Sequence, residues 1–234
     1  MKNHLCLLFL FTSNLIIGQE NTESKFWTTV GYIYQPLEKL TFGIHQLYRL
    51  KDNYNAVDTY ITEFNTDYSL KNKLNLELEL RYYYKNDNTG NVQGYENLWR
   101  YRLGVEKEWK IKPFKLFLRA AYQNRQSIDR NDKTTKYFRT RYAFEYAIKK
   151  WDWDPYFSFE YLSKLSGNKL KKYRFGFGSS NKVNGSKWTF RYYFETNKKR
   201  TIPDYHILSL KYRYKDKSKK IKKNKKNPET KTEV

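Results

Sequence analysis

Arginine and glutamate recur at alternate positions through most of the chain, and these are the residues best placed to do chemistry. Between Leu74 and Tyr84, for example, Glu77, Glu79 and Arg81 alternate with apolar residues. Charges of both signs at this spacing can form charge-assisted hydrogen bonds with one another, or line a pore that selects ions by charge. The set comprises Glu77, Glu79, Arg81, Arg100, Arg102, Glu106, Arg119, Arg139, Arg141, Glu145, Glu160, Arg174, Arg191 and Glu195.

Hydrolytic chemistry needs a nucleophile beside a base, and histidine is scarce. After the first twenty residues the chain contains His45 and His206, and Ser209 follows His206 by three positions. In a strand, side chains three positions apart point to opposite faces, so these two cannot form a nucleophile–base pair. Histidine and cysteine also lack the spacing of metal ligands. We therefore expect no catalytic residue, no metal and no cofactor, and keep a lipid hydrolase as the alternative function.

Strands are the elements that position the charged set. In Leu74–Tyr84 the period is two, which predicts a strand with one apolar and one charged face. Its length suits a tilted membrane-spanning strand of about 9–11 residues. Similar patterns occupy 26–35, 40–50, 57–70, 97–109, 114–125, 136–148, 156–162, 171–179, 187–196 and 205–214. We predict an all-β fold, a closed antiparallel up-and-down transmembrane β-barrel of 10–12 strands.

The connections between these strands alternate in length. Short ones are expected near Pro36, Asn72, Lys112, Asp152 and Asn184, and longer polar ones at 51–56, 85–96, 126–135, 163–170 and 197–203. Outer-membrane barrels have short periplasmic turns and long external loops. Single-chain bacterial barrels also have even strand numbers, whereas eleven candidates are found. Either residues 26–35 are not a wall strand, which leaves ten, or a further strand makes twelve.

Segments outside the strands suggest four regions. Residues 1–18 resemble a secretory signal peptide, with Lys2 before the apolar run 5–11, although a retained membrane anchor is the alternative. Residues 19–25 form a polar lead-in, and residues 26–214 form the barrel. Residues 215–234 are rich in lysine and poor in apolar residues, so we expect a disordered tail that is solvated or binds anionic headgroups.

The apolar face could point outward to lipid or inward in a soluble barrel. Aromatic residues make up 19% of the chain and occur on the apolar face of nearly every strand. If this face filled the interior of a soluble barrel, it would need small residues as well. Tryptophans lie near strand ends, as in the aromatic girdles of membrane barrels. Arginine opposite glutamate suits a narrow lumen. We therefore expect the rings to face lipid and the charges to form either an anion-selective pore or a self-paired plug.

The function class follows from this location. We expect a non-catalytic protein of the cell outer membrane, either structural or a narrow anion- or solute-binding pore. The alternatives are a hydrolase of phospholipid or lipopolysaccharide, and surface recognition through the long loops. Expected partners are outer-membrane lipids, lipopolysaccharide and the barrel-assembly machinery, with a monomeric state. The net charge of +22 favours anionic partners, but a periplasmic tail without aromatics argues against nucleic acid.

Several short motifs resemble those of an uncharacterised family of outer-membrane β-barrels from Gram-negative bacteria, domain of unknown function 2490. They are Trp27, YRLG at 101–104, FRTRY at 138–142, FGFG at 175–178 and HILSLKYRY at 206–214. The resemblance covers roughly residues 26–214. It implies the fold and the outer-membrane location but no activity. The last strand also looks like a barrel-assembly signal, although Ser209 stands where glycine is usual and a tail follows it.

Overall fold

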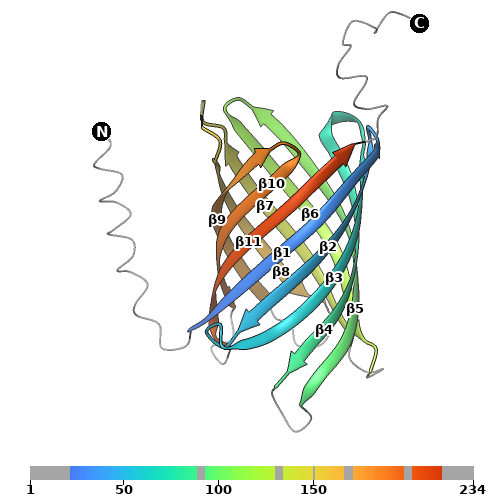
Figure 1. The fold of residues 1–234 in the computed structure, drawn as a ribbon, viewed down its shortest axis with the longest axis vertical. Helices are drawn as coiled ribbons and strands as arrows, with labels where there is room; N and C mark the ends of the chain where they lie inside the picture. The colour runs from blue at the N-terminus through green and yellow to red at the C-terminus, as the bar shows by residue number, and fades with distance from the viewer. Residues whose placement is uncertain are drawn as a thin grey trace, which may run out of the picture.

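A computed structural model describes residues 22–88, 93–129, 134–149, 151–165, 171–197 and 202–217. These residues form a closed β-barrel of eleven tilted strands with one short 3-10 turn, η2 (Lys71–Lys73) (Figure 1). The strands are β1 (Thr22–Leu37), β2 (Leu40–Lys51), β3 (Ala56–Ser69), β4 (Leu74–Asp87), β5 (Gly94–Ile111), β6 (Phe114–Ser127), β7 (Thr134–Tyr146), β8 (Asp154–Lys164), β9 (Lys171–Val183), β10 (Ser186–Asn197) and β11 (Asp204–Lys217). The predicted barrel class is thereby confirmed. In the described part of the chain, no helix has the length and apolarity to cross a membrane.

Closure of the barrel is achieved by a parallel pair. Strands β1 and β11 run side by side in the same direction, and their pairing extends from Thr22–Asp204 to Gln35–Lys217 (Figure 1). All other neighbours pair antiparallel. Eleven strands lie within the predicted range of 10–12, but the expected even count and the fully antiparallel arrangement were wrong. Because β1 has a ladder on both sides, it is a full wall strand, and an odd number of strands leaves no unpaired edge.

The first and last strands are longer than the sequence pattern indicated. Strand β1 begins at Thr22, inside the expected lead-in, and β11 ends at Lys217, inside the expected tail. Near its start, Lys25 lies 3.5 Å from Glu23 and 3.7 Å above the ring of Tyr205 on β11. These polar contacts extend the pairing beyond the apolar pattern. The expected signal peptide and the rest of the tail lie outside the described residues.

The two faces of the wall differ in polarity. Leu78, Phe177 and Val30 point outward and are 37%, 44% and 60% exposed. Glu79 and Glu160 point inward and are 3% and 5% exposed. The alternation of each strand places apolar groups outside and charged groups inside. A barrel with an apolar interior, the alternative raised by the sequence, is therefore wrong.

Short turns lie at one end of the barrel and most of the longer connections at the other. The β9–β10 turn uses Asn184 and Gly185 with φ values of 47° and 82°, which is the type I′ geometry that favours tight hairpins. The β7–β8 connection, 147–153, lies at the turn end but is longer than expected. There the Trp151 indole N–H donates a hydrogen bond to the Trp153 carbonyl at 2.6 Å. The ring centroids of Trp153 and Phe190, on β10, are 5.4 Å apart. The connection thus folds back against the wall.

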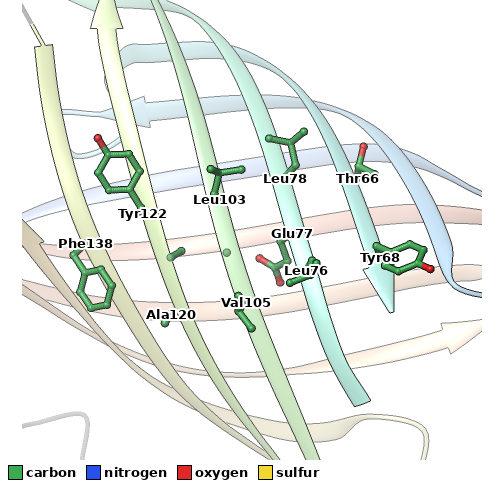
Figure 2. A pocket seen from close by; sticks show the side chains of 12 residues that line it. Thr66, Tyr68, Leu76, Glu77, Leu78, Leu103, Val105, Ala120, Tyr122 and Phe138 are labelled. Atoms are coloured by element: carbon green, nitrogen blue, oxygen red, sulfur yellow. The ribbon is translucent and has the colours of Figure 1, made fainter. Parts of the chain in front are cut away.

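A shallow hollow marks the outer face of β4–β7 (Figure 2). It surrounds Ala120, whose larger neighbours on this face include Leu103, Tyr122 and Phe138. Glu77 also lines it, although its strand position turns that side chain to the other face of the wall. The hollow arises because alanine is the smallest residue of this outward row. It is a feature of the apolar exterior.

Candidate functional site: the charged lumen

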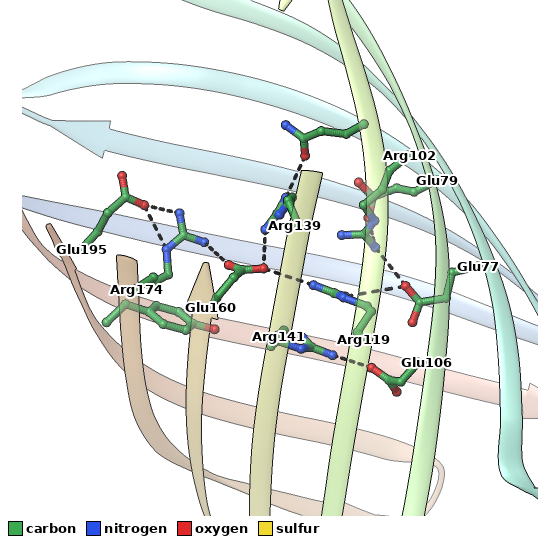
Figure 3. A network of polar contacts seen from close by, with 12 residues as sticks. Glu77, Glu79, Arg102, Glu106, Arg119, Arg139, Arg141, Glu160, Arg174 and Glu195 are labelled. Carbon is green, nitrogen blue, oxygen red and sulfur yellow. Dashed lines mark hydrogen bonds and ion pairs between the residues drawn. The ribbon is translucent and has the colours of Figure 1, made fainter. Parts of the chain in front are cut away.

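Glu160 on β8 is the hub of the ion pairs inside the barrel (Figure 3). It accepts hydrogen bonds from Arg139 on β7 at 2.7 Å, Arg174 on β9 at 3.0 Å and Arg119 on β6 at 3.3 Å. Arg174 also donates through Nε to Glu195 on β10 at 3.0 Å. One buried carboxylate therefore holds together three guanidinium groups from three strands.

A second hub forms at Glu79 on β4. It lies 2.7 Å from Arg102 and 3.0 Å from Arg81, and it is also paired with Arg100. Arg100 is 6% exposed, so its charge is removed from solvent together with that of Glu79. Charge-assisted hydrogen bonds are stronger than hydrogen bonds between neutral groups. They therefore offset part of the free energy that is lost when both charges leave water.

Besides the Arg119–Glu160 pair, which passes over β7, two more ion pairs cross over an intervening strand. Arg119 on β6 lies 3.6 Å from Glu77 on β4, and Arg141 on β7 donates to Glu106 on β5 at 2.6 Å. Neighbouring strands are about 4.8 Å apart. The two side chains of such a pair must therefore reach across the strand between them, on the lumen side of the wall. Arg119 joins the two hubs, since it contacts Glu160 and also Glu77, which shares Arg102 with Glu79. These ion pairs therefore form one network across the barrel, with the Arg141–Glu106 pair beside it (Figure 3).

The network continues onto β2 and β3 through Glu63. This carboxylate is 5% exposed, pairs with Arg81 and lies 3.2 Å from Nδ1 of His45. The imidazole is itself 3% exposed and lies over Gly31 of β1, where a Cβ atom would overlap its ring. His45 is thus an enclosed partner of a carboxylate, and no serine or threonine in the described part of the chain is hydrogen-bonded to it.

The structure places the charged set predicted from the sequence on the inner face. Most members are in the network, whereas Glu145 pairs with Lys115. Arg191 makes no ion pair among the described residues; it lies 4.0 Å above the ring of Tyr156 and donates to the Tyr193 hydroxyl at 3.3 Å.

Several inner residues outside the set predicted from the sequence also take part. Glu63, Gln123 and Lys172 contact members of the network, His45 contacts Glu63, and Lys115 contacts Glu145. The same alternation could have found them, because each lies on the inward register of its strand. They were left out because single polar residues between apolar ones give a weaker signal than arginine–glutamate repeats.

An apolar cluster lies beside the network on the inner face of β2–β5. Ile61, Tyr83 and Leu98 are buried together, with Leu47 packed against them. On each strand these residues stand one inward step beyond a member of the network, toward the end with the longer connections. Charged and apolar layers therefore fill the interior of β2–β5 in succession.

The other candidate for chemistry, His206 with Ser209, does not form a pair. Ile207 between them is 1% exposed and points inward, so His206 lies on the outer face. Its Nδ1 is 2.5 Å from the hydroxyl of Tyr192. Ser209 shares the inward register of Ile207. The two side chains therefore lie on opposite faces of the wall, as the spacing predicted.

Fold and lumen together define a closed β-barrel protein with an apolar outer face and an ion-paired interior. The chain belongs to the family described as Protein of unknown function (DUF2490), which matches residues 24–206. This match confirms the resemblance seen in the sequence motifs. No curated protein and no solved structure matches the chain. The described residues contain no group of three or more histidine, cysteine, aspartate or glutamate side chains that could hold a metal ion.

Proposed function

We propose that the protein is an outer-membrane β-barrel with a closed lumen, in which the ion-pair network is a structural plug. The observation that carries this proposal is the burial of the inner residues. Glu79, Arg100, Arg119 and Glu160 are 3%, 6%, 8% and 5% exposed, although a water-filled channel would expose them. A narrow barrel whose interior is filled by side chains has no room for a continuous aqueous path.

The outer face supports the membrane location. Large apolar residues are exposed on every strand, whereas soluble monomers rarely expose contiguous apolar patches above a few hundred Å². Strand closure also satisfies the backbone hydrogen bonds that lipid cannot satisfy. On this proposal the partners are outer-membrane lipids, lipopolysaccharide and the assembly machinery, and the barrel is a monomer. A cleaved signal peptide would deliver it, and the anion- or solute-binding role would be confined to whatever space the plug leaves.

Conductance in planar lipid bilayers tests the plug. We expect the purified, refolded barrel to insert and to remain silent across a range of salt concentrations. Insertion is checked independently by protease protection in vesicles made from the same lipids, so that silence cannot result from failed insertion. A steady ohmic conductance from inserted protein would contradict the plug and favour an open pore.

Location is tested separately. Cells that express the full chain are fractionated into inner membrane, outer membrane and soluble material. We expect a folded, heat-modifiable band in the outer-membrane fraction and none among soluble proteins. A folded barrel that stays soluble without detergent would contradict the membrane proposal and leave the plug unaffected.

A further inference from the structure

Four cations inside the barrel stand apart from the network. They are Lys187 and Arg191 on β10 and Lys211 and Arg213 on β11, which we name the unpaired cation group. Lys187 is directly opposite Arg213 in the β10–β11 ladder, while Arg191 is opposite Ser209 and Lys211 is opposite Thr189. All occupy the inward register of their strands. Their positions run from the middle of the lumen to its turn end.

No carboxylate neutralises this group. Among the residues that the structure describes, none of the four forms an ion pair within 4.0 Å. The carboxylates near enough to interact at longer range are Glu63 for Lys211, Glu63 and Asp67 for Arg213, and Glu145 for Lys187.

Each of these carboxylates has another partner. Glu63 pairs with Arg81, Glu145 pairs with Lys115, and Asp67 accepts a hydrogen bond from the Asn65 amide at 2.8 Å. Lys182, directly opposite Lys187 in the β9–β10 ladder, adds a further positive charge beside the group, so like charges gather here, which is unfavourable in a partly desolvated site.

Solvent reaches the unpaired cation group although it does not reach the hubs of the network. All four cations are partly exposed, as are the paired Arg141 and Arg174, whereas the hub carboxylates Glu79 and Glu160 are buried. Inward-facing side chains on a closed wall can be exposed only to space inside the barrel or at its end. A wet space therefore adjoins the group.

Small residues line the wall around the group. Thr189 lies between Lys187 and Arg191 on β10, and Ser209 on β11 is the ladder partner of Arg191. Thr29 and Gly31 on β1 are the ladder partners of Lys211 and Arg213. The Thr189 hydroxyl is the second sign of a ligand. Thr189 is 4% exposed, and its hydroxyl oxygen has no hydrogen-bond partner among the residues that the structure describes. A buried polar group without a partner is rare and costly.

We propose that the unpaired cation group, with the Thr189 hydroxyl, binds a small multivalent oxyanion such as phosphate at the turn end of the lumen. Arginine presents paired N–H groups that match two oxygens of such an anion, and lysine supplies a compact charge beside them. Two guanidinium and two ammonium groups would offset both charges of a phosphate dianion. The site deepens the proposed function, since it rests on the closed lumen, but it does not depend on the membrane.

Calorimetric titration tests the site. The full-length barrel, purified in detergent in a chloride-free buffer, is titrated with inorganic phosphate, with sodium chloride at equal ionic strength as the comparison. We expect saturable phosphate binding that chloride does not reproduce. In Lys211→Met and Arg213→Gln, binding should weaken roughly tenfold or more, since each removes one charge-assisted hydrogen bond.

A matched control separates the site from net charge. Lys172→Met removes an inner lysine that is paired with Glu195 at 3.0 Å, so the barrel loses the same charge but keeps the unpaired cation group. We expect its phosphate affinity to be unchanged. Glycerol 3-phosphate distinguishes two sources of the oxyanion: binding tenfold weaker than phosphate indicates the free ion, and equal binding indicates a phosphate group carried on a larger molecule.

Thermal unfolding gives a second reading. Without phosphate, Lys211→Met should unfold at a higher temperature than the wild type, because an unpaired charge has been removed, while Lys172→Met should unfold at a lower one. Phosphate should raise the midpoint of the wild type and not that of Lys211→Met. Absence of saturable phosphate binding, equal loss in Lys172→Met, or failure of Lys211→Met to fold would each overturn the proposal. Conductance has no bearing on these results, so the plug and the site can fail separately.

Discussion

Inward-facing charges are neutralised by ion pairs in one region of the lumen and not in another. From β3 to β9, arginines are matched by carboxylates, and Glu79 and Glu160 each contact three guanidinium groups. On β10 and β11, the unpaired cation group has no such partner among the described residues. The hub carboxylates of the first region, Glu79 and Glu160, are buried, whereas all four cations of the second region are partly exposed.

The difference teaches that the inward charges have two roles. Taking a charge out of water is costly, and only good geometry with an opposite charge offsets the cost. The paired region satisfies this condition within the protein and can serve as a plug. The unpaired region does not, so it depends on water or on an added anion. Charge inside a barrel is thus evidence of a ligand only where the protein leaves it unneutralised.

Removal of Glu160 should have the largest effect. Glu160→Gln leaves Arg119, Arg139 and Arg174 without their shared carboxylate, and we expect a loss of about 3–5 kcal/mol in the free energy of unfolding. Urea unfolding in detergent, followed by tryptophan fluorescence, measures it. As a control, Glu108→Gln breaks a pair with Lys110, which is 51% exposed, and should cost about 0–1 kcal/mol. Equal losses in the two variants would show that the network is not a stabilising plug.

An arginine on the outer face should have the next largest effect. The lumen accepts arginine because carboxylates surround it, whereas Leu78 faces outward and is 37% exposed. Leu78→Arg should cost about 2–4 kcal/mol if the position lies at mid-membrane. The yield of folded barrel after refolding into lipid vesicles measures this, with Leu78→Met as the volume-matched control. An unchanged yield would argue against lipid at this face.

Crowding at Gly31 should produce a smaller loss. A Cβ atom there would overlap the ring of His45, which is enclosed beside Glu63, so Gly31→Ala should cost about 1–3 kcal/mol. Gly104→Ala is the matched control in the paired region, since its Cβ would come no closer than 3.3 Å, to the Glu77 carboxylate. Urea unfolding should show little change for the control. A neutral Gly31→Ala would mean that His45 can leave its position freely.

The Thr189 hydroxyl should have the smallest effect. Thr189→Val keeps the shape but removes a buried oxygen without a partner, so we expect a gain of about 1 kcal/mol in phosphate-free buffer. The gain should shrink when phosphate is present. A loss of stability in phosphate-free buffer would show that the hydroxyl is already satisfied, which would weaken the contrast between the two regions.

Alternation in the sequence is sufficient to predict the wall. Residues 74–84 were expected as a strand with Glu77 and Glu79 inward, and β4 covers them from Leu74 to Asp87. What alternation cannot supply is the stagger between strands, which decides which inward side chains meet. Arg119 therefore contacts Glu160 two strands away, an arrangement that no local spacing reveals.

The same limit explains Arg191. In sequence it resembles Arg174, since both alternate with aromatic residues. In the barrel, Arg174 lies beside Glu195, whereas Arg191 faces Gly178 on β9 and Ser209 on β11. The parallel β1–β11 pair was also beyond prediction, because the expected even count came from other barrels and not from these residues.

Because β1 and β11 point the same way, the chain enters the barrel at one mouth and leaves it at the other. Thr22 marks the entry and Lys217 the exit. If the barrel spans a bilayer, epitope tags fused just before Thr22 and just after Lys217 would report opposite compartments, whereas an even count of antiparallel strands would place both in one.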